Sequence, residues 1–256
     1  MNVFITGGSA GIGAALAKAY AAEGATVGVI ARRGEQLKAL LETLPPPKAA
    51  AHWSAIVDVL DHAELASAAA SFMAHAGTPD VVIANAGISS GSLISVPGDL
   101  PVIEKIFRTN VMATAATFAP FIESMKTLGQ SRLVAIASVA GIRGLPGSAA
   151  YCASKAAVIT MAESLRIELL NTNIRVVTIV PGFIKTPMTR GNPYSMPFLM
   201  PVDQFAKRAL SAIASGSSYR VIPWQMGIVA KLLRILPNAI FDRALVNARR
   251  KPRAAS

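Results

Sequence analysis

Short apolar runs alternate with longer segments of helical pattern along almost the whole 256-residue chain. The runs lie at residues 2–6, 26–31, 50–57, 80–86, 132–138, 174–181 and 219–223, and the helical patterns lie near residues 11–23, 34–43, 61–76, 100–127, 151–171 and 202–215. Apolar runs without strict polar alternation are typical of strands buried on both faces. Their alternation with helices predicts parallel β–α–β units, and therefore an α/β fold with a doubly wound parallel sheet of about seven strands and helices on both faces.

The chain is expected to form a single domain. Hydrophobic residues make up 52% of it and charged residues 15%, a balance that suits one sizeable core and excludes a disordered chain. The sequence LPPPK at residues 44–48 ends a helix in a connecting loop, and no long linker or internal repeat divides the chain.

Several classes of protein are excluded by simple features of the sequence. The first residues, MNVFITGG, lack the basic and apolar stretches of a signal peptide, and no run of about 18 apolar residues is present to span a membrane. Cys152 is the one cysteine, so no internal disulfide is expected and a reducing, cytoplasmic compartment is favoured. The histidines, His52, His62 and His75, lack metal-ligand spacing, so no metal site is expected.

The first strand runs directly into a glycine-rich turn, TGGSAGIG, at residues 6–13. Gly7, Gly11 and Gly13 stand where a strand turns tightly into a helix, and glycine lets backbone amides come close to a phosphate. The N-terminus of the following helix favours the negative charge of a pyrophosphate. In this position the turn predicts a dinucleotide site, and the absence of a GK[ST] signature argues against a P-loop nucleotidase.

A second pattern, YCASK at residues 151–155, places a tyrosine and a lysine four positions apart. Residues at this spacing are neighbours on a helix surface, so Tyr151 and Lys155 point in the same direction. Taken alone, the pair is either a catalytic acid with the cation that tunes it, or two amphipathic side chains on a solvated helix face. The two residues by themselves leave both interpretations open.

Six motifs in order along the chain resemble the short-chain dehydrogenase/reductase family. They are the Thr-Gly-x-x-x-Gly-x-Gly turn, DV at 58–59, NAG at 85–87, Asn110, Ser138 with the Tyr-x-x-x-Lys pair, and PGFIKT at 181–186. The resemblance implies a Rossmann-type fold in which residues 1–223 form the dinucleotide-binding catalytic domain. Residues 224–256 are then a basic amphipathic extension of the same domain. The family usually pairs its long helices, so a homodimer or homotetramer is also implied.

The resemblance assigns a role to each of four residues. Tyr151 is the acid or base that exchanges a proton with the substrate oxygen during hydride transfer. Free tyrosine titrates near a pKa of about 10, and a cationic Lys155 together with an oxidised nicotinamide favours tyrosinate and lowers that pKa. Lys155 also holds the nicotinamide ribose, Ser138 orients the substrate oxygen, and Asn110 holds a water on the proton path.

The end of the second strand indicates which dinucleotide binds. An acid at this turn would accept hydrogen bonds from the adenosine ribose, but the chain has Arg32 and Arg33, whose planar cations suit a 2′-phosphate. We therefore expect NADP(H) in preference to NAD(H); two surface arginines without a ligand are the alternative. The residues expected at the cofactor are Gly7, Ser9, Gly11, Ile12, Gly13, Arg32, Arg33, Asp58, Val59, Asn85, Ala86, Gly87, Tyr151, Lys155, Pro181, Gly182, Ile184 and Thr186.

The expected substrate loop is PMTRGNPYSMPFLMP, at residues 187–201, which is rich in proline, methionine and aromatic residues. Its apolar side chains either cover an apolar substrate or pack on the core of the protein, and both interpretations stay open; methionine suits an adaptable wall. The residues expected at the substrate are Ser138, Tyr151, Met188 and Tyr194.

The C-terminal extension carries most of the formal net charge of +11, because residues 220–256 contribute +7 and the remainder +4. Apolar residues recur in it at helical spacing, at Ile228, Leu232, Ile235 and Leu236, and Pro237 permits a second helix. Such a segment either lies peripherally on an anionic inner membrane surface or packs on its own subunit or a partner. No nucleic-acid recognition motif accompanies the charge, so no nucleic-acid partner is expected.

Together these features predict an NADP(H)-dependent oxidoreductase that interconverts a carbonyl and a secondary alcohol, on an apolar or lipid-like small molecule. A 3-oxoacyl thioester reductase is the alternative within the same mechanism. A dinucleotide-binding sensor or a membrane-surface interaction protein is the alternative outside enzymes, and it would be expected to have lost part of the catalytic set.

Overall fold

The computed structural model describes residues 1–253 and contains the predicted parallel sheet. Seven strands pair in the order β3-β2-β1-β4-β5-β6-β9, and every pairing is parallel. The strands are β1 (Asn2–Thr6), β2 (Thr26–Ala31), β3 (Trp53–Ile56), β4 (Val81–Ala84), β5 (Ser131–Ile136), β6 (Ile174–Pro181) and β9 (Tyr219–Ile222). The expected doubly wound sheet in one domain is confirmed.

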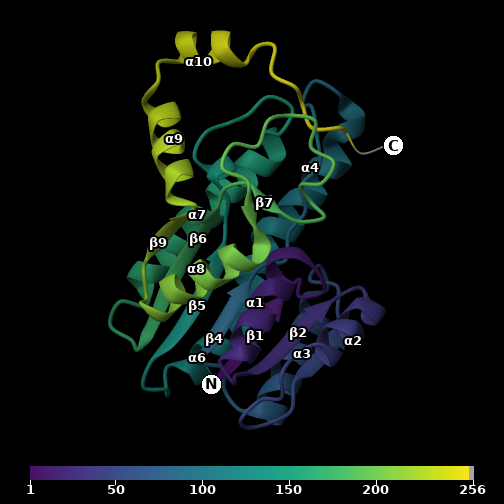
Figure 1. The fold of residues 1–256 in the computed structure, drawn as a ribbon, viewed down its shortest axis with the longest axis vertical. Coiled ribbons are helices and arrows are strands. Elements are labelled where there is room, and N and C mark those ends of the chain that lie inside the picture. The colour runs from purple at the N-terminus through teal and green to yellow at the C-terminus, as the bar shows by residue number, and fades with distance from the viewer. Residues whose placement is uncertain (254–256) are drawn as a thin grey trace.

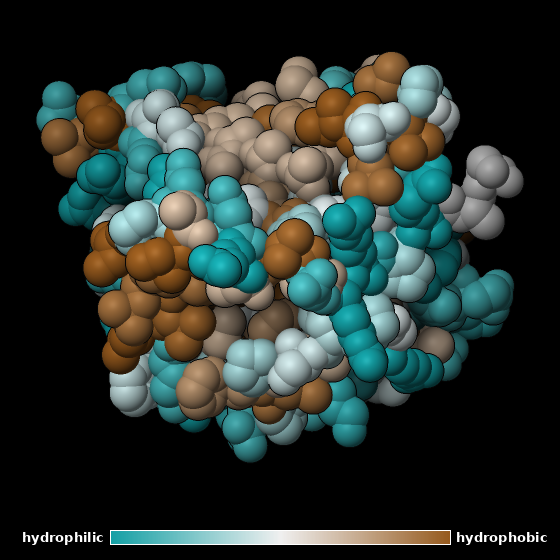
Figure 2. All heavy atoms as spheres, turned by 90° about the horizontal axis from the view of Figure 1, so that it is seen from above, coloured by the Kyte–Doolittle hydropathy of each residue, from teal (hydrophilic) through white to brown (hydrophobic). Residues whose placement is uncertain are grey.

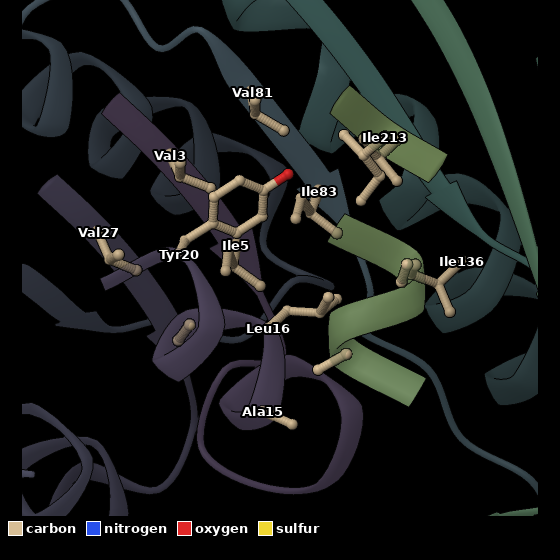
Figure 3. Close-up of a cluster of buried hydrophobic side chains, with 14 of the residues drawn as sticks. Val3, Ile5, Ala15, Leu16, Tyr20, Val27, Val81, Ile83, Ile136 and Ile213 are labelled. Carbon is tan, nitrogen blue, oxygen red and sulfur yellow. The ribbon is translucent and has the colours of Figure 1, made fainter. Parts of the chain in front are cut away.

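Helices cover both faces of the sheet (Figure 1). One face is covered by α1 (Gly11–Ala22), α2 (Gly34–Glu42) and α8 (Val202–Ala214). The other is covered by α3 (His62–Ala76), α5 (Ala113–Phe118), α6 (Ile122–Met125) and α7 (Ala149–Glu168). Figure 3 shows the first layer, in which Leu16 and Tyr20 of α1 lie against Ile5 of β1 and Ile83 of β4. This burial of apolar side chains between layers is what holds the strand ends in register.

The long helix expected at residues 100–127 is divided in the structure. It begins as α4 (Leu100–Phe107), opens into one π-helical turn (Arg108–Met112), continues as α5, and passes through a 3₁₀ turn (Ala119–Phe121) into α6. Pro120 explains the second interruption, because it has no amide hydrogen to donate to the helix. The π-helical turn contains Asn110, and such turns are common at functional sites.

The C-terminal extension forms α9 (Trp224–Ile235) and α10 (Asn238–Leu245), which lie at the end of the molecule near the carboxyl edge of the sheet (Figure 1). Arg143, in the loop before α7, donates hydrogen bonds to the carbonyl oxygens of Leu233 and Leu236, the latter at 2.7 Å. Its guanidinium carbon also lies 3.7 Å from the ring centroid of Phe241. The junction between α9 and α10 is therefore packed on the catalytic domain. Within residues 1–253, no helix combines the length and the apolar character that crossing a membrane requires.

Candidate active site

A cleft of about 390 Å³ lies along the carboxyl ends of the strands, beside the point where the sheet order reverses between β1 and β4. In open α/β sheets this is the position where ligands bind. Nearly all residues predicted at the cofactor line it, together with Ser138 and Met188. Three predicted residues do not line this cleft, namely Gly13, Asn110 and Tyr194.

The glycine-rich turn has the backbone shape that its sequence predicts. Gly7 and Gly11 have φ values of 68° and 57°, in the left-handed region that glycine adopts without strain. A side chain at Gly13 would place its Cβ 2.4 Å from the carbonyl oxygen of Gly7, so this position supports the turn from beneath the cleft. Asn85 fixes the same turn by donating from Nδ2 to the carbonyl oxygens of Thr6 and Gly7, at 3.0 and 3.1 Å. The cradle left above the turn fits the pyrophosphate of a dinucleotide.

Two arginines and a serine gather at the end of the cleft beside β2. Arg33 donates from Nη2 and Nε to the hydroxyl oxygen of Ser9, at 2.9 and 3.3 Å. Arg32 lies 3.8 Å from the carboxylate of Asp58, measured from Nη1 to Oδ2, and both side chains are well exposed. Asp58 lies two residues beyond the end of β3 at Ile56. This end of the cleft therefore carries two guanidinium groups and one carboxylate.

Tyr151 and Lys155 lie one turn apart near the N-terminus of α7, and both line the cleft. Lys155 is 5% exposed; its ammonium donates to the carbonyl oxygen of Ile136 at 2.8 Å and lies 6.0 Å from the ring centroid of Tyr151. Burial lowers the pKa of Lys155 to about 8. A solvated helix face does not account for a lysine held in this way, so the first interpretation of the pair is favoured.

The pKa of Tyr151 is raised to about 12, in the opposite direction to the expected lowering by Lys155. Burial of the phenol is the main cause, a hydrogen bond with Ser138 opposes it, and Cys152 and Tyr194 add smaller increases. The ammonium of Lys155 is bonded to the carbonyl oxygen of Ile136 and lies 6.0 Å from the ring centroid of Tyr151, so it does not offset the burial of the phenol. In the protein alone the phenol of Tyr151 is therefore protonated at neutral pH.

Ser138 lies two residues beyond β5 and begins a 3₁₀ turn (Val139–Gly141). Its hydroxyl accepts a hydrogen bond from the amide of Ala140 at 3.2 Å, and its proximity to the phenol of Tyr151 lowers the pKa of that phenol. The side chain of Ser138 thus lies beside the phenol at the cleft. A substrate oxygen placed between these two hydroxyls would receive hydrogen bonds from both.

Asn110 is fully buried behind the cleft in the π-helical turn. Its Oδ1 accepts from the amide of Ile88 at 2.8 Å, and its Nδ2 donates to the carbonyl oxygen of Ile88 and to the hydroxyl of Ser154, each at 3.0 Å. Asn110 therefore ties the loop after β4 to α7, between Tyr151 and Lys155. Ser154 was missed by the sequence analysis, although its place inside the Tyr-x-x-x-Lys motif was the available signal.

The expected substrate loop lies mostly at the surface. Met188 lines the cleft and is half exposed, as are Phe198 and Leu199, whereas Met200 is buried in the core. Tyr194 packs on Phe183 with ring centroids 6.3 Å apart. Core packing therefore holds for Met200, whereas the exposed side chains of Met188, Phe198 and Leu199 are not packed in the core.

Several residues of the cleft were not predicted. They are Ala10, Ala31, Val57, Ile88, Lys105, Thr109, Ile136, Ala137, Pro187 and Thr189. Thr189 shapes the loop, because its hydroxyl donates to the carbonyl oxygen of Ile184 at 2.7 Å and accepts from the amide of Thr186 at 3.1 Å. Most of the others flank a motif that the sequence did reveal. Within residues 1–253, no group of three or more acidic, cysteine or histidine side chains is arranged to hold a metal ion.

Comparison with known proteins supports the family resemblance that the sequence motifs indicate. The family model described as short chain dehydrogenase matches residues 1–195. An "Uncharacterized oxidoreductase" of Myxococcus xanthus is 35% identical over 95% of this chain and 95% of its own length. A 3-oxoacyl-[acyl-carrier-protein] reductase, FabG, of Chlamydia trachomatis is 32% identical over 85% of this chain and 92% of its own.

Solved structures share the fold. The 3-ketoacyl-(acyl-carrier-protein) reductase from Brucella melitensis complexed with NADH superposes with a TM-score of 0.78, at 23% identity, over 86% of this chain and 96% of its own. Levodione reductase also gives a TM-score of 0.78, at 24% identity, over 88% of this chain and 97% of its own.

Proposed function

The chain belongs to the short-chain dehydrogenase family, and we propose that it is an NADP(H)-dependent reductase of a carbonyl group in an apolar or lipid-like small molecule. One observation carries the proposal: Ser138, Tyr151 and Lys155 line the same cleft as the glycine-rich turn. A dinucleotide held by that turn would lie in the cleft that these side chains also line. The same arrangement argues against a sensor that has lost its catalytic set.

The mechanism follows from the protonation states of the side chains. When bound, the nicotinamide supplies the hydride. The protonated phenol of Tyr151 gives its proton to the substrate oxygen, while the hydroxyl of Ser138 holds that oxygen in place. Lys155 would hold the nicotinamide ribose, and it carries positive charge up to a pKa of about 8, which would stabilise the tyrosinate left after the transfer. Carbonyl reduction requires this protonated form of Tyr151, and alcohol oxidation requires the tyrosinate.

The preference for NADP(H) is supported by the arginines beside β2. A 2′-phosphate in this region would meet Arg33 and the hydroxyl of Ser9, which are already bonded to each other, and the second guanidinium of Arg32. Guanidinium groups recognise phosphate through paired, charge-assisted hydrogen bonds. The carboxylate of Asp58 is engaged with Arg32, so it opposes that charge only in part.

A 3-oxoacyl thioester reductase is the second candidate, since the FabG proteins of Chlamydia trachomatis and Chlamydia muridarum are 32% and 35% identical to this chain. The catalytic chemistry would be the same, and only the group attached to the carbonyl would differ. Such a thioester therefore belongs in any substrate panel.

The test begins with NADPH and NADH binding measured by fluorescence, followed by turnover of ketones, 3-oxoacyl thioesters, steroids and aldehydes. Tyr151→Phe is the control, because it removes only the hydroxyl that gives the proton. We expect tighter binding of NADPH than of NADH, and turnover that falls about a thousandfold in the variant while NADPH binding is kept. NADPH binding without turnover of any compound would favour a sensor, and absence of dinucleotide binding would refute both assignments.

We further propose a cytoplasmic homodimer or homotetramer, with α9 in contact with an anionic membrane surface. Four apolar residues on α9 recur at helical spacing and are each at least half exposed: Trp224, Ile228, Leu232 and Ile235. Lys231 and Arg234 lie among them, which suits an interface with anionic lipid. Sedimentation with anionic liposomes at low salt tests this proposal. Equal partitioning of the intact chain and of Leu232→Asp would reject it.

A further inference from the structure

The last described residues return across the catalytic end of the molecule, where Figure 2 shows hydrophobic and hydrophilic groups interleaved. We call residues 249–253 the C-terminal strap. Arg249 donates to the carbonyl oxygen of Pro193 at 3.2 Å, and Lys251 donates to the hydroxyl of Ser89 at 3.0 Å. The amide of Gly91 donates to the carbonyl oxygen of Pro252 at 3.0 Å. The strap is therefore bonded to the loop after β4 and to the substrate loop.

Both of these loops, and a third, border Tyr151. Ile88 of the first loop and Met188 and Thr189 of the second line the cleft that contains Tyr151. The third loop precedes α7 and ends at Ser148, three residues before Tyr151. The amide of Ser92 donates to the carbonyl oxygen of Gly147 at 3.1 Å, which joins the first loop to the third.

The strap is fastened by one ion pair with a buried partner. Arg253 donates to both carboxylate oxygens of Asp99, from Nη2 to Oδ1 at 2.8 Å and from Nε to Oδ2 at 2.9 Å. The side chain of Asp99 is 6% exposed, and its Oδ2 also accepts from the amide of Leu93 at 2.8 Å. A bidentate arginine–carboxylate pair fixes the relative orientation of the two side chains as well as the distance between them.

Two glycines make room for the strap. A Cβ at Gly91 would lie 2.2 Å from the carbonyl oxygen of Lys251 and 2.7 Å from that of Pro252. A Cβ at Gly147 would lie 3.0 Å from the Cβ of Arg250. The close approach of backbone to backbone at Gly91 is a fit that a solvated basic tail does not require.

From these contacts we propose that the C-terminal strap is the outer wall of the substrate site and limits how long the non-reacting end of the substrate is. This inference rests on the proposed function. The strap is bonded to two loops that line the cleft beside Tyr151. A long substrate would therefore meet it after the reacting carbonyl has reached the phenol. The pair between Arg253 and Asp99 keeps this wall closed, which makes Arg253 a positioning residue for specificity.

The experiment compares the full-length enzyme with Arg253→Ala, which breaks the ion pair, and with Arg208→Ala as a control on the exposed surface of α8. Turnover is measured with NADPH on a series of 3-oxoacyl N-acetylcysteamine thioesters from four to twelve carbons, together with 2-ketones of the same lengths. Hydrogen exchange of the peptide containing Gly91 and Ser92 is measured in the same three proteins. Gly91→Ala, which displaces the strap without altering a charge, is the second variant, with Gly129→Ala as its control because a Cβ there meets nothing within 4 Å.

We expect both strap variants to raise the ratio of kcat/KM for the longest to the shortest substrate by at least about tenfold, while NADPH binding is unchanged. The amide of Gly91 should exchange faster in Arg253→Ala and at its original rate in Arg208→Ala. An unchanged ratio despite faster exchange would overturn the proposal, and so would unchanged exchange. If the parent enzyme turns over no member of either series, the proposed function fails instead. This outcome can be told apart from failure of the strap proposal because it does not depend on any variant.

Discussion

The ammonium of Lys155 donates a 2.8 Å hydrogen bond to the carbonyl oxygen of Ile136, the last residue of β5. This bond joins α7 to the carboxyl edge of the sheet and holds a cationic side chain in a place that is almost closed to water. Burial lowers the pKa of Lys155 from an ordinary value of 10.5 to about 8, so the charged form is disfavoured by the fold. Lys155 is thus retained at a cost to stability.

The first prediction concerns that cost. Lys155→Met should raise the free energy of unfolding at pH 7 by about 1–2 kcal/mol, because about 3 kcal/mol of charge burial is removed and the hydrogen bond to Ile136 is lost. Turnover should fall about a thousandfold. A variant that is less stable than the parent at pH 7 would show that the hydrogen bond outweighs the burial. Denaturant unfolding, with turnover measured in parallel, gives both values.

The second prediction follows from the sign of the same shift. Below pH 8 both the folded and the unfolded states carry a protonated Lys155, so the full cost of burying its charge lowers the free energy of unfolding. Between pH 8 and 10.5 the unfolded state binds more protons than the folded state, so the cost declines as pH rises. The stability advantage of Lys155→Met should therefore shrink from pH 7 to pH 10. Unfolding of both proteins across this range checks it, and a constant difference would contradict the lowered pKa.

The third prediction concerns Asn110. Asn110→Leu leaves the amide and carbonyl of Ile88 and the hydroxyl of Ser154 without their partner, so we expect a loss of about 2–4 kcal/mol in unfolding free energy. Turnover should fall by more than about tenfold, because the loop after β4 would no longer be tied to α7. Asn171→Leu, an exposed asparagine after α7, is the matched control. Equal melting temperatures for the two variants would contradict this role.

The sheet was predictable because its signal is local and repeated. Each strand is a short apolar run such as residues 26–31, and each is separated from the next by a helical pattern. The spacing of the hydrophobic residues was therefore enough to predict which segments are strands and which are helices. Strand ends were less predictable: the run at residues 50–57 gives a strand of only four residues, Trp53–Ile56. In the sequence, extended residues that lie beyond the hydrogen-bonded pairing of two strands look the same as those within it.

The site was predictable where a backbone constraint selects a residue type, as at Gly7 and Gly11. It was not predictable where contacts join distant segments. The pair of Arg253 with Asp99 links residues 154 positions apart, and the sequence near residue 253 has the composition of a solvated basic end. The π-helical turn at Asn110 was missed for a similar reason, since the hydrogen bonds of Asn110 reach Ile88 and Ser154, which lie 22 and 44 positions away in the sequence.

The fourth prediction tests the choice of dinucleotide. Arg33→Ala should weaken NADPH binding by about 10–100-fold, because the fork that Arg33 presents beside Ser9 is removed, and should change NADH binding by less than about threefold. Arg190→Ala, in the substrate loop, is the control for loss of one positive charge. Fluorescence titrations with both dinucleotides are sufficient. Equal weakening of NADPH and NADH binding would mean that Arg33 supports the shape of the cleft rather than contacting a 2′-phosphate.

The last prediction concerns the support of the glycine-rich turn. Gly13→Ala would bring a Cβ to 2.4 Å from the carbonyl oxygen of Gly7 and 2.6 Å from Nδ2 of Asn85, and the first of these atoms belongs to a backbone that cannot rotate away. The turn must then rise into the space for the pyrophosphate, at a cost of about 1–3 kcal/mol. We expect dinucleotide binding to weaken more than a hundredfold while the far-ultraviolet circular dichroism spectrum is kept. Gly129→Ala should leave both properties unchanged. Binding close to that of the parent enzyme would show that the turn relaxes without closing the cradle.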